Sequence, residues 1–419
     1  MNVDSERPKD AHTYFLSRIV FNINQRKKQE KLRYCSRVFE WNELLLSVIG
    51  LYPGKFSFAR FYLNLAYFTA AMGLEYLDLV LSLGDFELVV LNLTENAAFT
   101  HIYAYTLSLW LGNREIGQLL GQVASDFAAD YTDQEIATLR RYYFRARVFI
   151  EFLFVNLFTT ASSYFMQPFT GQMDQILGYM RGSSANSSIV YQLPYRFHAF
   201  HRVDEPASYL WTSAAYAPFV LVTFFNQSSG ECCLIALVYH VAAQMAVLAS
   251  RIRAIEPGND CTEQLANCLR RHARLLRMGQ QINKVFSAML LVHLTGIILL
   301  VCLVGYQLLW CLANGEYALL PSFVVWMCLL LVSLYVHCTV GETLITESDR
   351  LHGAYYDCRW NEMPPSTARW IVLAMARSSR TLTLNAGSFS TLSLATYTSS
   401  LKASLGYLSV FRTVMQSES

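Results

Sequence analysis

The stretch ASYLWTSAAYAPFVLVTFFNQSSGECCLIALVYHVAAQMAVLAS, from Ala207 to Ser250, decides how many times this chain crosses a membrane. It holds 44 residues and a single charge, Glu231, whereas one membrane-spanning helix needs only about 20 apolar residues. It is therefore either one overlong helix or two short spans divided near Ser228-Ser229-Gly230. The direction of every later span depends on which alternative holds.

Further windows of spanning length lie on both sides of this stretch. Five are apolar enough to cross a bilayer without argument: Phe61 to Leu83, Leu88 to Leu111, Val148 to Gln167, Val285 to Leu312 and Ala318 to Gly341. The stretch from Ser388 to Met415 has the same length but is unusually polar, with eleven Ser and Thr residues. The sequence therefore predicts seven or eight spans.

The distribution of Lys and Arg distinguishes the two alternatives, because these residues accumulate in cytoplasmic loops. With one helix at 207–250 and a cytoplasmic N-terminus, 28 Lys and Arg residues lie inside and 5 outside. With two spans in that stretch the tally becomes 18 against 15. We therefore predict an all-α membrane protein with seven transmembrane helices and a cytoplasmic N-terminus.

This topology divides the chain into segments. Apolar positions at helical spacing continue beyond the membrane in 261–284 and 366–380, so the last four spanning helices are expected to extend into a cytoplasmic anchor bundle. Asn186, in an N-glycosylation signal, lies in the long outer loop. The expected segments are a cytoplasmic N-terminal region (1–56), four transmembrane helices (57–250) with an outer loop (168–206), a cytoplasmic anchor extension (251–284), two transmembrane helices (285–345), a second anchor segment (346–387), and a pore-lining helix with a short extracellular C-terminus (388–419).

Composition excludes several classes of protein. Charged residues make up 15% of the chain, against about 25% in soluble domains, so a soluble enzyme is excluded. Lys and Arg (33) nearly balance Asp and Glu (31), so there is no basic field for nucleic acid. The ten Cys residues form no CxxC pair and no metal-ligand spacing, and the polar N-terminus is unlike a cleaved signal peptide. We expect no metal and no cofactor.

Ionisable residues inside the predicted spans are candidates for function, because burying them in hydrocarbon is costly. They occur as scattered singles without a paired dyad, and each is expected to hydrogen-bond a neighbouring helix. No catalytic motif accompanies them, so the chain is not expected to be an enzyme. The residues are Glu75, Asp78, Glu95, His101, Glu151, His240, His293, His337 and Glu342.

The hydroxyl-rich stretch 388–415 either packs tightly against other helices or lines water. If this stretch is a helix with 100° per residue, hydroxyl groups and two valines one turn apart lie along one stripe of its surface. This pattern is typical of a water-filled path that is closed by an apolar constriction. Close packing of a small-residue helix in a monomeric bundle fits equally well. The stripe consists of Thr396, Ser399, Gly406, Val410 and Val414.

Aromatic and small polar residues alternate in the outer halves of the helices expected at 88–111, 148–167, 207–250 and 318–341. Such a lining suits a small, mostly apolar ligand held by shape and few hydrogen bonds. The predicted pocket residues are Asn96, Phe99, Phe158, Ser162, Phe165, Tyr209, Ser213, Tyr216, Phe323, Trp326 and Met327.

The run NAGSFSTLSLATYTSSLKASLGYLSVFRTV, from Asn385 to Val414, resembles the last-helix signature of insect odorant receptors. Four other stretches resemble that family in the same order, and together they cover nearly the whole chain: LPYRFHAF (193–200), HVAAQMAVLASRI (from His240), CLRRHARLL (from Cys268) and Leu344 to Trp360.

This resemblance implies a ligand-specific subunit that assembles with the family's shared co-receptor. The product would be a four-subunit, odorant-gated, non-selective cation channel in the plasma membrane of olfactory neuron dendrites. Each subunit would contribute its last helix to a central pore, with Val410 and Val414 at the gate. The anchor segments would join the subunits, and a small volatile odorant would bind in the outer pocket. Lys402 and Arg412 depart from this pattern, because cations on a pore helix oppose cation conduction.

Three alternatives stay open from the residues themselves. A G-protein-coupled receptor also has seven spans, but it requires an outside N-terminus, and the NPxxY motif is absent. A gustatory-type channel is a second alternative, although Thr396-Tyr397 is followed by SSLKAS rather than Gln-Phe. A secondary transporter is disfavoured by the absence of an internal repeat.

Overall fold

The computed structural model describes residues 26–180, 193–198, 201, 203, 205–315, 317 and 319–418. Within these ranges the side chains of residues 26–31, 87, 167, 170–180, 206 and 410–418 are outside the description. The described chain is almost entirely helical. Its α-helices are α2 (Arg26–Val48), α3 (Phe58–Leu81), α4 (Phe86–Leu111), α5 (Asn113–Phe127), α6 (Asp133–Met180), α7 (Pro206–Arg253), α8 (Cys261–Asn314), α9 (Leu320–Asp357), α10 (Pro365–Ser378) and α11 (Leu394–Glu418).

The deciding stretch 207–250 is one helix, α7, of 48 residues. Its internal Pro218 costs one backbone hydrogen bond, a loss that long apolar helices tolerate when neighbouring helices support them. The Ser228-Ser229-Gly230 triplet does not interrupt the helix. The prediction of a single overlong helix is therefore confirmed.

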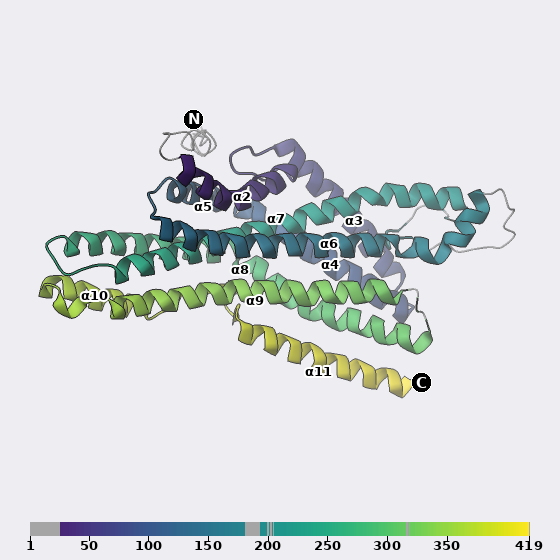
Figure 1. The fold of residues 1–419 in the computed structure, drawn as a ribbon. Coiled ribbons are helices and arrows are strands. Elements are labelled where there is room, and N and C mark those ends of the chain that lie inside the picture. The colour runs from purple at the N-terminus through teal and green to yellow at the C-terminus, as the bar shows by residue number, and fades with distance from the viewer. Residues whose placement is uncertain are drawn as a thin grey trace, which may run out of the picture.

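Long helices α6 to α9 run side by side along the length of the molecule, while α3 and α4 cross them obliquely (Figure 1). Four helices are long and apolar enough to cross a membrane by composition alone, over the ranges Asp133–Met166, Ala207–Arg253, Cys261–Asn314 and Leu320–Glu362. Helices α3, α4 and α11 complete the set of seven. They carry acidic, histidine or hydroxyl side chains within their length, such as Glu75, Glu95 and Ser399.

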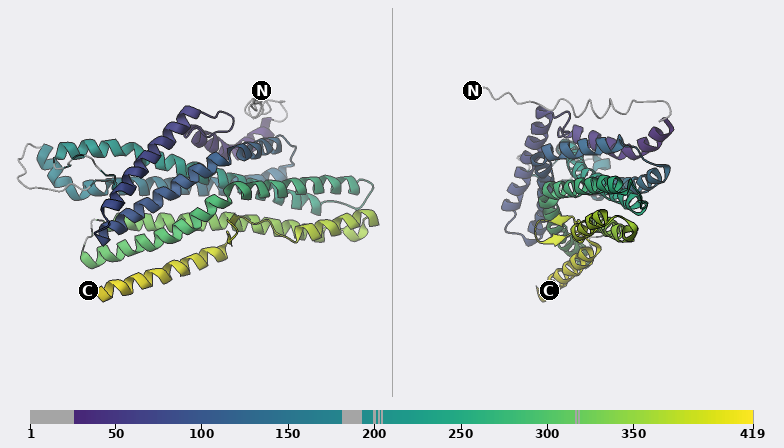
Figure 2. Two further views of the ribbon diagram at one scale, coloured as in Figure 1. Left: turned by 180° about the vertical axis from the view of Figure 1, so that it is seen from behind. Right: turned by 90° about the vertical axis from the view of Figure 1, so that its left-hand side faces the viewer.

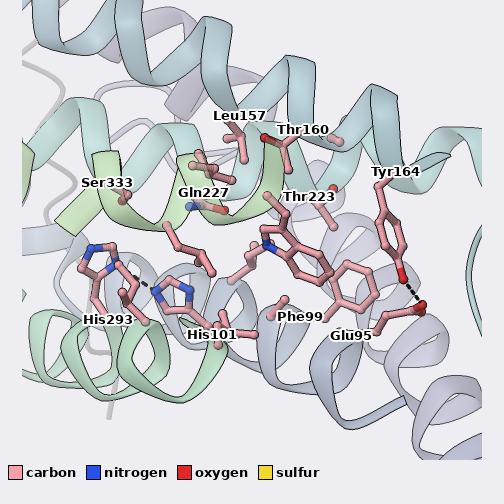
Figure 3. A pocket seen from close by; sticks show the side chains of 18 of the residues that line it. Glu95, Phe99, His101, Leu157, Thr160, Tyr164, Thr223, Gln227, His293 and Ser333 are labelled. Atoms are coloured by element: carbon pink, nitrogen blue, oxygen red, sulfur yellow. Dashed lines mark hydrogen bonds between the residues drawn. The ribbon is translucent and has the colours of Figure 1, made fainter. Parts of the chain in front are cut away.

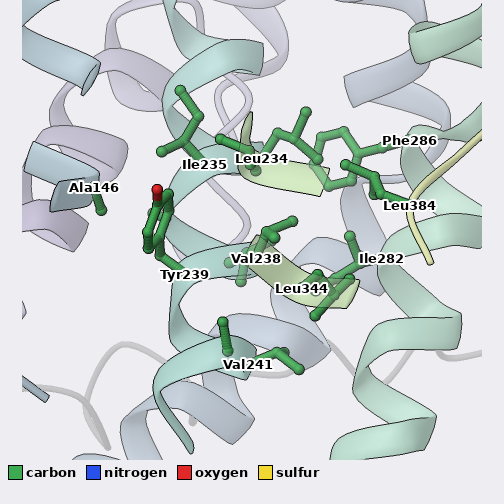
Figure 4. Close-up of a cluster of buried hydrophobic side chains, with 14 of the residues drawn as sticks. Ala146, Leu234, Ile235, Val238, Tyr239, Val241, Ile282, Phe286, Leu344 and Leu384 are labelled. Atoms are coloured by element: carbon green, nitrogen blue, oxygen red, sulfur yellow. The ribbon is translucent and has the colours of Figure 1, made fainter. Parts of the chain in front are cut away.

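The core is centred on α7, which packs against α2, α3, α4, α6, α8 and α9. Residues 226–249 of α7 are all buried except Ala246. Figure 4 shows part of this core, where Val238 of α7 lies toward α8 and α9 and Tyr239 lies toward Ala146 of α6. A helix that is apolar on every side is suited to such a buried position.

One end of the bundle, the α10 end, holds α5, the α7–α8 connection and α10 (Figure 1). Polar contacts join the helices there. Asp126 of α5 accepts from His240 of α7 at 3.0 Å and pairs with Arg274 of α8. Lys284 donates to Glu115 at 3.0 Å, and this hydrogen bond lowers the pKa of the Glu115 carboxyl. The extensions predicted for 261–284 and 366–380 are thus helical and packed together at this end.

The connection from α10 to α11 crosses α8 and α9 as a short hairpin, in which β1 (Asn385–Ala386) pairs antiparallel with β2 (Ser390–Thr391). Gly341 of α9 permits this close approach, because a Cβ there would overlap the carbonyl oxygen of Leu392. Beyond the hairpin, α11 lies at the edge of the bundle against α8 and α9, and its C-terminal part diverges from the other helices (Figure 2).

Candidate ligand-binding cavity and peripheral helix

A cavity of about 90 Å³ lies inside the bundle, in the half away from α10. Helices α4, α6, α7, α8 and α9 surround it, together with Tyr195 from the segment 193–198. Its lining consists of Glu95, Ala98, Phe99, His101, Ile102, Leu157, Thr160, Ala161, Tyr164, Tyr195, Thr223, Gln227, His293, Ile297, Leu300, Trp326, Leu329, Leu330 and Ser333. Pockets for drug-sized ligands are typically about 300–1,000 Å³, so this one suits a smaller molecule.

The middle of the cavity is apolar and aromatic. Phe99 of α4 packs edge-on against Tyr195 with ring centroids 5.7 Å apart, and Tyr164 of α6 packs against Trp326 of α9 at 5.2 Å. Tyr195 reaches the cavity because the segment 193–198 folds inward, where the backbone N–H of His198 donates to the carbonyl of Leu74 at 3.2 Å. These rings provide shape and apolar area for a ligand.

One end of the cavity is acidic (Figure 3). Glu95 is 3% exposed, and each of its carboxyl oxygens accepts one hydrogen bond. The Tyr164 hydroxyl donates to Oε1, and the backbone N–H of Arg196 donates to Oε2 at 3.1 Å. The carboxyl is therefore held in a fixed position at the cavity wall.

The opposite end carries a histidine cluster. Nε2 of His101 lies 3.1 Å from Nδ1 of His293, and the Tyr105 hydroxyl lies 2.7 Å from the same Nδ1 atom. The ring of His337 lies 4.0 Å from that of His293, and its Nδ1 donates to the carbonyl of Ser333 at 2.8 Å. Within the part of the chain that the structure describes, Nε2 of His293 and of His337 have no hydrogen-bond partner.

The expectation that ionisable residues in the spans are scattered singles is wrong for these positions. His101, His293 and His337 come from α4, α8 and α9 and meet only because those helices pack together. Glu75 of α3 lies beside Glu95 of α4 in the same way. The members of both groups are far apart in the sequence, so their proximity could not be predicted from it. Each residue was nevertheless a candidate for function, because burying such residues in hydrocarbon is costly.

The predicted pocket residues fall into three groups. Phe99 and Trp326 line the cavity. Others are buried or half-buried in the surrounding packing without lining it: Asn96, Ser162, Phe165, Tyr209, Ser213, Tyr216, Phe323 and Met327. Phe158 is 53% exposed on the outer side of α6. Alternation of residue types located four of the five helices around the cavity and missed α8, and it did not give the face of each helix.

Several lining residues were not among the predicted pocket positions. Tyr195 lies in the LPYRF segment, which had been assigned to a loop, and Thr223 and Gln227 lie in the middle of α7. The signal that could have identified Gln227 is its amide group in an otherwise apolar helix. No comparable signal marks Tyr195, because a loop residue enters the core only through tertiary contacts.

Helix α11 presents two different faces. Ser400 and Ser404 are buried against the bundle, where Sγ of Cys302 on α8 donates to the backbone carbonyl of Ser404 at 3.8 Å. Ser399 and Gly406 are exposed, and Thr396 is partly exposed. The side chains of Val410 and Val414, and the whole of Asn186, lie outside the described residues.

The elements above define a class of protein: a polytopic membrane protein with seven long helices and a small cavity between them. Over the described residues, no group of three or more His, Cys, Asp or Glu side chains is arranged to hold a metal ion. The fold and the cavity therefore indicate a receptor-type membrane protein.

Comparison with known proteins gives the family. Residues 85–405 match the model of the 7tm odorant receptor family. The structure superimposes on that of the insect olfactory receptor OR5 from Machilis hrabei with a TM-score of 0.76 and 14% identity, covering 91% of this chain and 99% of the other. The complex of the same receptor with eugenol gives a TM-score of 0.75 and 13% identity, covering 92% of this chain and all of the other. The chain belongs to the 7tm odorant receptor family.

Curated relatives share more sequence with this chain than the solved receptor does, but over a shorter part of it. Odorant receptor 13a of Drosophila melanogaster is 24% identical over 233 residues, which cover 48% of this chain and 54% of that protein. Odorant receptor 85b of the same organism is 25% identical over 232 residues, covering 53% and 57%. The chain spans about half the length of these relatives. The predicted family and the seven-helix all-α fold are confirmed, and because the family consists of receptors, so is the prediction that the chain is not an enzyme.

Proposed function

We propose that this chain is the odorant-sensing subunit of a heteromeric, ligand-gated, non-selective cation channel. The observation that carries the proposal is the largely apolar cavity between α4, α6, α7, α8 and α9 in a member of the odorant receptor family. Its ligand would be a small volatile molecule, in keeping with the cavity volume of about 90 Å³ and with the eugenol bound by the solved insect receptor.

The pore would be lined by α11. Ser399 and Gly406 are exposed on a helix whose other face is packed against α8, so this stripe is free to face a shared axis between neighbouring chains. Thr396 would extend the stripe at the N-terminal end of α11, and Val410 and Val414 would form the apolar gate near its C-terminal end. The partner would be the family's co-receptor, with four chains around the axis.

In the proposed orientation the N-terminus and the α10 end lie in the cytoplasm. The excess of Lys and Arg in segments 1–60, 112–147, 251–284 and 346–380 supports it. The proposed location is the plasma membrane of the olfactory neuron dendrite, surrounded by lipid, with Asn186 glycosylated outside. Epitope tags on each terminus and antibody access on intact cells test this orientation. An exposed N-terminus would instead favour a G-protein-coupled receptor.

The decisive experiment records whole-cell current while a panel of volatiles is applied, with the chain alone, the co-receptor alone and both together. We expect volatile-evoked current only when both chains are present and the panel contains a ligand. Current of equal size from the co-receptor alone would contradict the proposal.

A variant tests the gate. Val410→Ser should produce current in the absence of any volatile, because a polar side chain at an apolar constriction favours its wetting. Leu405→Ser is the matched control, since Leu405 lies 140° around the helix from Val410. Equal leak currents from both variants would indicate general disruption of α11 rather than opening of a gate.

A further inference from the structure

Two acidic side chains lie together at one end of the cavity. Glu75 of α3 is fully buried, and Glu95 of α4 is 3% exposed. The two side chains lie close enough to interact electrostatically. Two buried carboxyls that interact share a proton unless a cation near them allows both to be ionised. The pair is therefore a place where a positive charge would be stabilised.

The two acids differ in how their oxygens are satisfied. Glu95 is held by the Tyr164 hydroxyl and the Arg196 backbone N–H. Neither oxygen of Glu75 receives a hydrogen bond from a donor in the described chain. A buried carboxyl without donors is costly in a membrane protein. Asp78, one turn further along α3, adds to the negative potential at Glu75.

Aromatic rings line the cavity beside Glu95. They are Phe99, Tyr164, Tyr195 and Trp326, and they are contributed by three helices and the segment 193–198. Tyr164 and Tyr195 lie with their ring centroids 6.1 Å apart. Cations are attracted to aromatic faces within about 6 Å, and desolvation strengthens this attraction. A carboxylate surrounded by such rings is suited to an organic ammonium group.

A metal ion would fit these surroundings less well. Metal cations of the size of Mg²⁺ or Ca²⁺ require about six oxygen ligands, whereas most of the groups around Glu95 are aromatic or aliphatic. The volume of about 90 Å³ also limits the length of the ligand's apolar part, which would extend from Glu95 along the aromatic middle toward His101 and His293.

We propose that this cavity recognises a small primary amine in its protonated form, with the ammonium group against Glu95, behind which Glu75 lies, and the alkyl or aryl part among the aromatic rings. The inference deepens the proposed function, on which it rests, by naming the chemical class of the odorant. Glu95 sets the position of the charge, and Glu75 supplies the second carboxyl that the bound cation neutralises.

The test compares two probes of nearly equal size, n-pentylamine and 1-pentanol, at pH 7.4, where the amine is protonated. Binding is measured on the purified full-length chain in lipid nanodiscs by ligand-induced thermal stabilisation, and current is measured in cells that also express the co-receptor. For the unmodified chain we expect the amine to bind at least about tenfold more tightly than the alcohol, because its charge is paired in a desolvated site.

Three variants show whether amine binding depends on the two carboxyl groups. Glu95→Gln retains an oxygen that accepts from Tyr164 but removes the charge, and should weaken amine binding by about 30-fold or more while changing alcohol binding by less than about threefold. Glu75→Gln should weaken amine binding by about tenfold or more. Glu151→Gln makes the same change on α6, outside the cavity lining, and should alter neither ligand. Retained alcohol binding shows that a variant is folded.

The outcomes separate this inference from the proposed function. Amine binding that depends on Glu95 supports the amine site even without current, in which case the channel proposal fails. Current or binding with other volatiles, but none with the amine, overturns the amine inference and leaves the channel proposal standing. The amine inference is also overturned if neither Glu95→Gln nor Glu75→Gln affects amine binding, or if neither probe binds.

Discussion

Helices α7 and α11 are both long enough to cross a membrane, yet they occupy opposite positions in the molecule. Helix α7 is surrounded by six other helices, and almost every residue from 226 to 249 is buried. Helix α11 contacts chiefly α8 and α9, and Leu405 and Tyr407 are 65% and 59% exposed. Helix α7 forms the centre of the protomer, whereas α11 has an exposed face that can contact lipid or another chain.

This difference shows that apolar character alone does not place a helix. The apolar surface of α7 is buried against protein, so substitutions there change the packing of the core. Hydroxyl groups on α11 hydrogen-bond largely within their own helix, as Ser399 and Ser409 do with carbonyls three residues earlier. We therefore expect α7 to govern stability and α11 to govern channel properties. Four predictions, in order of decreasing effect, test this division.

Leu237→Ala on α7 should lower the free energy of unfolding by about 2–5 kcal/mol, the range measured for buried leucines, because Leu237 is completely buried. Leu405→Ala on α11 removes the same atoms from an exposed position and should cost less than about 0.5 kcal/mol. Denaturation of the detergent-solubilised chain, followed by tryptophan fluorescence, measures both. Equal losses would contradict the contrast between the two helices.

Gly341→Ala on α9 should loosen the junction that leads into α11 at a cost of about 1–3 kcal/mol, as overpacking does, because its Cβ would meet the backbone of Leu392. Gly353→Ala on the same helix has open space around the new methyl group and is the control. Limited proteolysis of the segment 387–393 reports the change. If both variants resist cleavage as the parent does, the close contact at Gly341 does not hold the junction in place.

Glu342→Gln should weaken the attachment of the α11 N-terminus to α9 by about 1 kcal/mol. Its Oε2 accepts the backbone N–H of Leu394 at 3.1 Å, and a carboxylate at a helix N-terminus is stabilising by about this amount. The measurement is the volatile concentration for half-maximal current, which should shift in this variant. Glu362→Gln, on an exposed side chain of the short helix at 360–362, serves as its control. An unchanged response in Glu342→Gln would mean that this contact does not couple α9 to α11.

Lys402→Gln should have the smallest effect, a rise in single-channel cation conductance of about twofold or less. Lys402 is exposed and lies 40° around the helix from Gly406, so its charge repels cations near the proposed pore but is screened over about 8 Å at physiological salt. Arg359→Gln, far from α11, is the comparison. A conductance that falls on neutralising Lys402 would place this side chain away from the conducting path.

Much of the fold could be predicted from the sequence because membrane spans follow from the length and composition of continuous segments. The single helix at 207–250 was predicted from Lys and Arg counts alone, and the extension of 261–284 from its helical periodicity. Of the predicted pocket residues only Phe99 and Trp326 line the cavity, although Glu95, His101 and His293 were candidates because of their charge. Periodicity identifies which residues share a face, but it does not identify which face meets which neighbour.

The sequence by itself determined the seven helices, the unbroken α7 and the hydroxyl-rich character of α11, since each of these depends on residues adjacent along the chain. Tertiary structure alone decided that Glu75 meets Glu95, that three histidines from α4, α8 and α9 form one cluster, and that Tyr195 enters the cavity. These groups come from segments up to 236 residues apart, from His101 to His337. Their proximity depends on how helices pack, and no local pattern in the chain specifies that packing.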